Sequence, residues 1–167
     1  MILSSNEKSM VAVDSGFMRL TASIIGILFL LSLPLWLRPF GVKGNSMEPT
    51  LKQGDAIIVD TLSIKFIPPR RGELLVFRNP HKYKDGDAIQ VDVKRVIGLP
   101  GETVEGMYLG PLDYFVMGDN RAVSTDSRQF GAVQPENFVG RPILRISPLS
   151  RFTIFPIVPE PALVGGV

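Results

Sequence analysis

The stretch RGELLVF at residues 71–77 carries the pattern that predicts the fold, a glycine turn followed by a short apolar run. Comparable runs recur on both sides of it, and turn residues separate them, among 16 Gly and 14 Pro in the chain. Short apolar runs bounded by turn residues are typical of β-strands. The pattern predicts strands at Ala56–Val59, Leu74–Phe77, Ile89–Val93, Tyr114–Met117, Pro142–Ile146 and Phe152–Val158.

The segment after Phe40 is therefore expected to be mainly β. No stretch there repeats apolar residues every 3.6 positions, so we expect no long helix. Residues 40–156 are predicted to form one β-rich domain, a sandwich or a coiled sheet. The Pro- and Gly-containing residues 157–167 are predicted to be a loose C-terminal tail, and residues 1–19 an N-terminal tail.

The segment before this domain is different, because residues 20–37 contain no charged side chain and are rich in Ile and Leu. As a helix they would extend about 27 Å, close to the roughly 30 Å of a bilayer core. We predict a single transmembrane anchor over Leu20–Leu37, in preference to a buried helix or a cleaved signal peptide. Lys8 and Arg19 precede the run and Arg38 and Lys43 follow it, so the positive-inside rule does not orient it.

Composition excludes several kinds of site. The net charge is only +2, so no large excess of positive charge points to nucleic acid. The chain has no Cys, so it has no disulfide, thiol nucleophile or thiolate metal site. The single histidine, His81, lies in a polar stretch that reads as a solvated loop, although one imidazole would suffice for a Ser-His-Asp triad. We expect neither a metal nor an organic cofactor.

A candidate nucleophile, Ser46, follows the predicted anchor in the sequence Gly44-Asn45-Ser46-Met47-Glu48-Pro49. A serine on a glycine-led turn can expose its hydroxyl, and the backbone N–H groups of Gly44 and Ser46 are candidates for an oxyanion site. An ordinary surface turn has the same composition, so this pattern alone leaves both interpretations open.

A serine nucleophile needs a base, and with one histidine in the chain the remaining candidates are a carboxylate or a neutral lysine. Lys94 ends the alternating segment Ile89–Lys94, on the face opposite Val91 and Val93, and the charge of Arg95 beside it would disfavour its protonation if close. A solvated lysine on a strand fits the same pattern, so periodicity does not select Lys94.

A third candidate segment is the polar cluster at residues 118–128. It offers Ser124 as a hydrogen-bond partner for an amine, with Asp126 and Arg128 as an ion pair behind it. An exposed polar turn explains the same composition.

Four segments occur in order after the apolar run: NSMEPTL at 45–51, RGELLVF at 71–77, KRVIGLPGE at 94–102 and GDNRAVSTDSR at 118–128. In sequence and order they resemble the conserved boxes of bacterial type I signal peptidases. The resemblance implies a membrane-anchored serine endopeptidase with a mostly antiparallel β-sheet catalytic domain. It also implies that Ser46 is the nucleophile, Lys94 the general base, and Ser124 the residue that orients the lysine, with Asp126 and Arg128 in support.

The same resemblance implies the substrates and the location. The substrates would be secretory preproteins, cut after a small-x-small sequence as they leave the translocation channel. The protein would lie in the bacterial cytoplasmic membrane as a single-pass protein with its catalytic domain outside the cytoplasm; a thylakoid membrane is the alternative. The lipid bilayer would be a partner, and nucleic acid would not.

Two features depart from the family pattern. Some members carry a hydroxyl residue where this chain has Gly44, so the second oxyanion donor would be backbone or water. Only residues 95–117 separate Lys94 from Gly118, where some relatives insert a further domain. Two other functions remain as alternatives, a self-cleaving Ser/Lys regulatory protease and a non-catalytic membrane-tethered β binding module.

Overall fold

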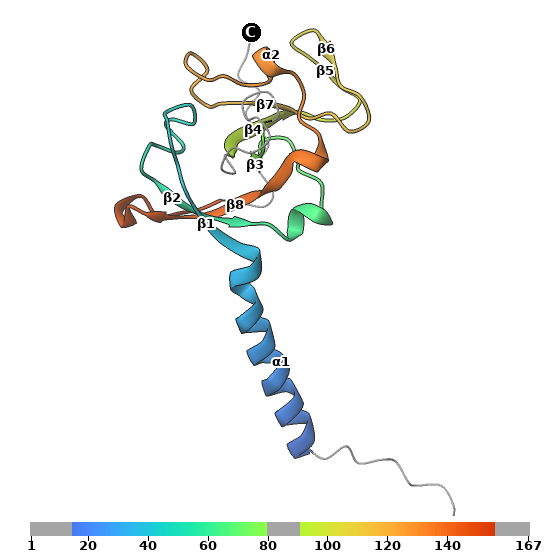
Figure 1. Cartoon of the computed structure of the whole chain (residues 1–167), viewed down its shortest axis with the longest axis vertical. Coiled ribbons are helices and arrows are strands. Elements are labelled where there is room, and N and C mark those ends of the chain that lie inside the picture. The colour runs from blue at the N-terminus through green and yellow to red at the C-terminus, as the bar shows by residue number, and fades with distance from the viewer. Residues whose placement is uncertain (1–14, 80–90, 156–167) are drawn as a thin grey trace, which may run out of the picture. The chain divides into compact units, whose positions relative to one another are not determined.

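The computed structural model describes residues 15–79 and 91–155. The chain divides into two compact units, residues 1–35 and 36–167. The first contains most of one helix, α1 (Ser15–Trp36), and the second contains every strand assigned within the described residues (Figure 1).

Helix α1 includes most of the segment that was predicted to cross a membrane. Within the described part of the chain, no helix is identified that combines the length and the apolar character needed to span a bilayer, so the span at residues 20–37 stays a prediction. The prediction counted uncharged residues, whereas the observed helix begins at Ser15 and takes in Arg19. Leu37 is no longer helical and starts a strand.

The second unit is a mostly antiparallel β domain, as predicted. Six strands form a path in the order β1-β2-β8-β3-β4-β7, and β9 pairs with β8 off this path. Every pairing in this sheet is antiparallel. The bounds are β1 Leu37–Gly41, β2 Ala56–Asp60, β3 Leu74–Phe77, β4 Asp92–Gly98, β7 Phe115–Met117, β8 Phe138–Ser147 and β9 Thr153–Ile154.

Short elements complete the domain. A separate hairpin pairs β5 (Thr103–Val104) with β6 (Met107–Tyr108). Helix α2 (Ser127–Phe130) is a single turn, and three 3₁₀ turns, η1, η2 and η3, cover Ser63–Lys65, Pro135–Asn137 and Leu149–Arg151. These pieces are too short to produce the 3.6-residue repeat that identifies a helix from sequence.

Strand β3 explains why residues 74–77 form an unbroken apolar run. Leu74 and Val76 belong to a cluster with residues from β2 and the segment before it, and Leu75 and Phe77 belong to a second cluster that includes Val96. The strand is therefore buried on both faces, which removes the alternation that a half-exposed strand shows.

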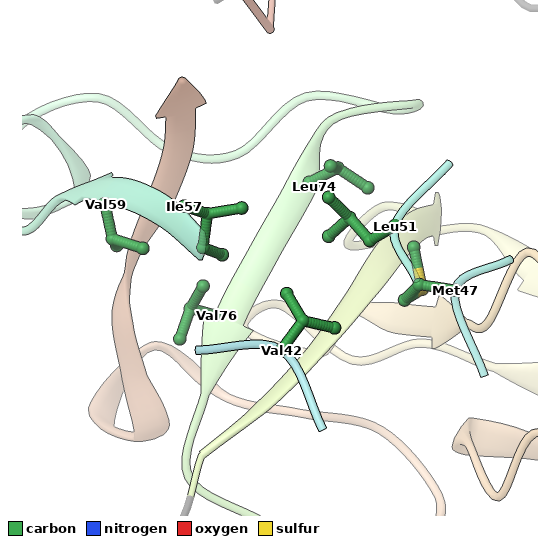
Figure 2. Close-up of a cluster of buried hydrophobic side chains, with 7 residues drawn as sticks. All are labelled: Val42, Met47, Leu51, Ile57, Val59, Leu74 and Val76. Carbon is green, nitrogen blue, oxygen red and sulfur yellow. The ribbon is translucent and has the colours of Figure 1, made fainter. Parts of the chain in front are cut away.

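The first of these clusters connects the sheet to the turn that carries Ser46. Figure 2 shows Met47 and Leu51 of that turn beside Leu74 of β3. Met47 is 1% exposed and Leu51 is fully buried. The cluster comprises Val42, Met47, Leu51, Ile57, Val59, Leu74 and Val76.

The predicted strands differ from the observed ones mainly at their ends. Prediction and structure coincide for β3, and differ by one residue for β2 and β7. The strand expected at Ile89–Val93 begins at Asp92 and continues to Gly98, with residues 89 and 90 outside the described part. Strand β8 is longer than predicted, and β1 was not predicted because its sequence continues the apolar run of α1.

Candidate active site

Ser46 lies on a tight turn between β1 and β2. The backbone N–H of Glu48 donates to the Asn45 carbonyl at 3.1 Å, and that of Leu51 donates to the Met47 carbonyl at 2.8 Å. Gly44 enters the turn with φ +79°, a left-handed conformation that a residue with a Cβ rarely adopts. Burial of Met47 and Leu51 fixes the apolar side of the turn and leaves Ser46 half-buried on the other side.

Lys94 is the third residue of β4, a strand held between β3 and β7. Its Cα pairs with that of Leu75, and its side chain is buried, with 4% of the residue exposed. The Lys94 Nζ donates a hydrogen bond to the Ser46 Oγ at 2.6 Å. The two residues, 48 positions apart in sequence, are therefore in direct contact through their functional atoms.

A groove of about 280 Å³ opens beside this pair. One wall comes from the segment around β1 and the Ser46 turn, and the other from β4 and the residues just before it. Its lining residues are Phe40, Gly41, Val42, Lys43, Gly44, Ser46, Met47, Ile57, Val76, Val91, Asp92, Val93 and Lys94. Two extended backbone segments along a groove with both polar and apolar lining suit an extended peptide, whose main chain can add to strand edges.

Gly44 and Ser46, whose backbone N–H groups are the candidate oxyanion donors, both line the groove. Neither donates a hydrogen bond to another residue of the described chain. No heavy atom lies within 4 Å of the position that a Cβ on Gly44 would take. The geometry therefore leaves room for a substrate carbonyl beside these groups, although it gives no hydroxyl at position 44.

Ser124 lies close to the nucleophile through a shared neighbour, Gly118. A Cβ built on Gly118 would be 2.2 Å from the Ser124 Oγ and 2.5 Å from the Ser46 carbonyl oxygen. Ser124 is buried, and its Oγ makes no hydrogen bond of normal geometry within the described residues. The predicted bond from Ser124 to Lys94 is thus not present, but the hydroxyl is packed against the same glycine as the Ser46 main chain.

Asp126 and Arg128 form the predicted ion pair. The Arg128 Nε donates to Asp126 Oδ1 at 2.8 Å and its Nη2 to Oδ2 at 3.0 Å. Asp126 also caps α2, with a reciprocal bond from its N–H to the Gln129 side chain, and accepts the Gly118 N–H at 3.0 Å. The ion pair therefore fixes both Gly118 and the helix that follows Ser124.

The Asp126 carboxyl has a pKa below its usual value. Burial raises this pKa, but hydrogen bonds from the Arg128 side chain and the Gly118 N–H lower it by more, and the nearby Ser124 hydroxyl adds to the effect. The carboxylate therefore stays ionised at neutral pH while fully buried.

A second ion pair, which the sequence did not predict, joins Arg95 to Asp119. The Arg95 Nε donates to Asp119 Oδ1 at 2.8 Å and its Nη2 to Oδ2 at 2.6 Å. Asp119 also accepts the Thr50 hydroxyl at 2.6 Å, and the next residue, Asn120, donates its N–H to the Ser46 carbonyl at 3.0 Å. These contacts hold the Ser46 turn against the loop after β7.

This pair changes the role expected for Arg95. We expected its charge to disfavour protonation of Lys94, but the charge is compensated by a bidentate carboxylate. Burial raises the pKa of Asp119, and the hydrogen bonds from Arg95 and Thr50 lower it by more, so its pKa lies below the usual value. In the sequence, the only indication of this pair is that Arg95 and Asp119 lie in two of the segments that resemble the family, 94–102 and 118–128.

His81 lies outside the described residues. Among residues 15–79 and 91–155, no three acidic, His or Cys side chains are grouped so as to hold a metal ion.

Comparison with known proteins matches the part of the chain that contains the candidate site residues. Residues 15–110 and 106–147 match the sequence profile of the family described as "Signal peptidase, peptidase S26". The chain is similar to a "Probable signal peptidase I-1" of Synechocystis sp., with 35% identity over 143 residues that cover 68% of this chain and 73% of the relative.

Two further relatives have comparable similarity. A "Signal peptidase I" of Leptolyngbya laminosa is 35% identical over 139 residues, which cover 66% of this chain and 68% of the relative. A "Signal peptidase IB" of Staphylococcus aureus is 31% identical over 159 residues, which cover 68% of this chain and 80% of the relative.

Proposed function

The chain belongs to the signal peptidase I family of peptidase S26, serine endopeptidases that remove signal peptides, and we propose that Ser46 is its nucleophile and Lys94 its general base. One observation carries the assignment, the 2.6 Å contact between Lys94 Nζ and Ser46 Oγ at the edge of the groove. A base must lie within hydrogen-bond reach of the proton that it removes, and this pair meets that condition.

The proposed reaction proceeds through an acyl-enzyme. Neutral Lys94 takes the Ser46 hydroxyl proton while the Oγ attacks the scissile carbonyl, and the backbone N–H groups of Gly44 and Ser46 donate to the oxyanion. Protonated Lys94 then gives its proton to the leaving amine. In the second half, Lys94 activates a water that hydrolyses the Ser46 ester.

The supporting residues act on this pair without touching the substrate. We propose that Ser124, which packs beside Gly118 near the Ser46 main chain, orients the lysine. Asp126 and Arg128 hold Gly118 and the helix after Ser124. We therefore propose that they are positioning residues.

The substrates are preproteins with signal peptides, as the family implies, and we propose cleavage after a small-x-small sequence. The test is to incubate the full-length chain in detergent with a purified preprotein and to sequence the new N-terminus of the product. Cleavage at the end of the signal peptide supports the function. Ser46→Ala should reduce turnover by roughly 10⁴ to 10⁶ while the fold is kept. Near-normal cleavage by this variant would show that another residue is the nucleophile.

Membrane attachment is proposed separately, through the apolar surface of α1. Nine large apolar side chains of this helix are 48–68% exposed: Met18, Leu20, Ile24, Ile25, Ile27, Leu28, Leu30, Leu31 and Leu35. An apolar surface of this size favours contact with lipid or with another protein. We place the β domain on the extracytoplasmic side of a bacterial cytoplasmic membrane, near the translocation channel that releases the preproteins.

This placement is tested by alkaline carbonate extraction and by protease added to intact spheroplasts. Retention in the membrane pellet together with digestion of the β domain is the expected result. Recovery of the protein in the carbonate supernatant would contradict attachment, and protection of the domain from protease would contradict its orientation.

A further inference from the structure

A buried polar cluster lies behind the turn that carries Ser46. It consists of two guanidinium groups, from Arg145 of β8 and Arg151 of η3, and the carboxylate of Asp55, which precedes β2. We call these three side chains the clamp. The side chains of Asp55 and Arg145 are 2% and 9% exposed, and that of Arg151 is 26% exposed. A buried cluster of charged groups is costly unless each member is paired, so its contacts are informative.

The clamp binds the main chain of the Ser46 turn at three positions. The Arg145 Nη1 donates to the Thr50 carbonyl at 2.5 Å, and the Arg151 Nη2 donates to the Pro49 carbonyl at 3.2 Å. Asp55 accepts the Lys52 N–H at 2.9 Å. The second half of the turn is therefore held by charged groups, whose hydrogen bonds are stronger than neutral ones.

The clamp is itself rigid because its members bind one another. The Arg151 Nη1 donates to Asp55 Oδ1 at 2.9 Å, and the Arg145 Nη1 lies 3.6 Å from Asp55 Oδ2. The Arg145 Nε donates to the Arg151 carbonyl, and its Nη2 donates to the hydroxyl of Thr153. All of these contacts come from β8, η3, β9 and Asp55, and none involves the residues that form the proposed Ser-Lys pair.

We propose that Arg145 and Arg151 are positioning residues that set the reactive geometry of Ser46 from behind the turn. This inference rests on the proposed function. The two arginines lie 95 and 102 residues from the carbonyls that they hold. Arg151 also lies after residue 147, where the match to the family profile ends, so its role comes from the structure of this chain alone.

The physical reason is that the clamp holds the Pro49 and Thr50 carbonyls of the turn, whereas Asp119 holds only the Thr50 hydroxyl. The Ser46 carbonyl is held by Asn120, and the apolar side chains of Met47 and Leu51 anchor the opposite face. Without the clamp, the carbonyls of Pro49 and Thr50 lose their charged donors, and the second half of the turn is held less tightly. A displacement of about 1 Å at a reacting atom commonly reduces the rate by roughly 10²-fold.

The experiment compares three variants of the full-length chain, Arg145→Ala, Arg151→Ala and Arg141→Ala, with a preprotein substrate. Arg141 is a matched control, because it lies on the same strand, is 3% exposed, pairs with buried Glu73 and donates to the Ile67 carbonyl, outside the Ser46 turn. We express kcat per enzyme molecule whose serine is reactive. On this scale we expect Arg145→Ala and Arg151→Ala to lower kcat by roughly 10- to 100-fold and to change KM by less than about threefold. Arg141→Ala should lower the melting temperature but leave kcat per folded molecule unchanged.

A rescue measurement separates positioning from folding. Methylguanidinium added to Arg151→Ala, whose side chain was partly exposed, should restore part of kcat and should not change the activity of Arg141→Ala. Arg151→Ala also covers the case in which Arg145→Ala fails to fold. Two results would contradict the proposal. Arg151→Ala could keep normal kcat, or its activity could fall only in proportion to the unfolded fraction and not be restored by methylguanidinium. In either case the clamp only stabilises the fold.

These outcomes are distinct from failure of the proposed function. If the unsubstituted chain does not cleave the preprotein, the function itself is contradicted. If it cleaves the preprotein, and the clamp variants keep normal kcat per folded molecule as Arg141→Ala does, the function is supported and the clamp proposal is wrong.

Discussion

The strand that carries Lys94 and the turn that carries Ser46 reach the same site by different means. Lys94 is part of a regular ladder, with β3 on one side and β7 on the other, and its Cα pairs with that of Leu75. Ser46 lies outside any strand, on a turn held by side chains from distant parts of the chain. The base is thus positioned by backbone pairing, and the nucleophile by specific side-chain contacts.

The comparison teaches that substitutions should act differently in the two regions. In β4, a change at Lys94 alters the chemistry while the ladder keeps the backbone in place. Around the turn, residues that never contact the substrate can move the nucleophile. The following predictions proceed from the largest expected effect to the smallest.

Lys94→Arg should remove activity about as completely as Ser46→Ala, by roughly 10⁴-fold or more. Arginine keeps the positive charge but does not deprotonate in the accessible pH range, so it cannot accept the serine proton. Because both residues serve one step, the double variant should be no worse than either single variant. Steady-state kinetics with a preprotein checks this.

The pH profile and a histidine variant provide the controls. With a lysine base, kcat/KM should rise with pH as the neutral amine becomes populated. His81→Gln should leave both the rate and this profile nearly unchanged. An active Lys94→Arg enzyme, or one disabled by His81→Gln, would identify a different base.

Gly118→Ala tests the contact between the Ser46 turn and the loop after β7. The added Cβ would meet the Ser46 carbonyl oxygen at 2.5 Å and the Ser124 Oγ at 2.2 Å, so the turn or the loop has to move. We expect kcat to fall by roughly 10²-fold per folded molecule.

Gly140→Ala is the matched control for this change. Its Cβ would be 2.4 Å from the Asp60 carbonyl oxygen, a backbone clash of similar severity that lies between β8 and β2. It should lower the melting temperature without lowering kcat per folded molecule. Equal losses of kcat in the two variants would show that the effect of Gly118→Ala comes from general destabilisation.

Asp126→Asn should have the smallest effect, on stability more than on turnover. The buried Gly118 N–H and the cap of α2 lose a charged acceptor, so the free energy of unfolding at neutral pH should fall by about 1 to 3 kcal/mol. Urea unfolding followed by fluorescence measures it.

The difference in free energy of unfolding between Asp126→Asn and the unsubstituted protein should depend on pH in a definite direction. The pKa of Asp126 is lower in the folded state than its ordinary value of about 3.9, so the unfolded state binds the proton first as pH falls. The stabilisation is therefore full above the ordinary aspartate range and is lost as pH falls through the folded pKa. The stabilities of Asp126→Asn and the unsubstituted protein should converge in acid; a difference that is constant with pH would contradict the ion pair.

The sequence by itself determined the β class and the catalytic candidates. The apolar run at residues 74–77 and its flanking turns predicted β3, because a strand buried on both faces has to be apolar at every position. Ser46, Lys94 and the segment 118–128 were selected by their resemblance to a family, since an ordinary turn and a solvated strand lysine have the same local pattern.

Only the tertiary structure decided how these residues meet. The contact between Lys94 and Ser46, the pairing of Arg95 with Asp119 and the clamp on the Ser46 turn all join segments more than 20 residues apart. Periodicity reports which face of a single segment is buried, but it carries no information about which distant segment covers that face. The role predicted for Ser124 depends on tertiary packing in the same way, because Ser124 lies beside Gly118 and near the Ser46 main chain only in the folded protein.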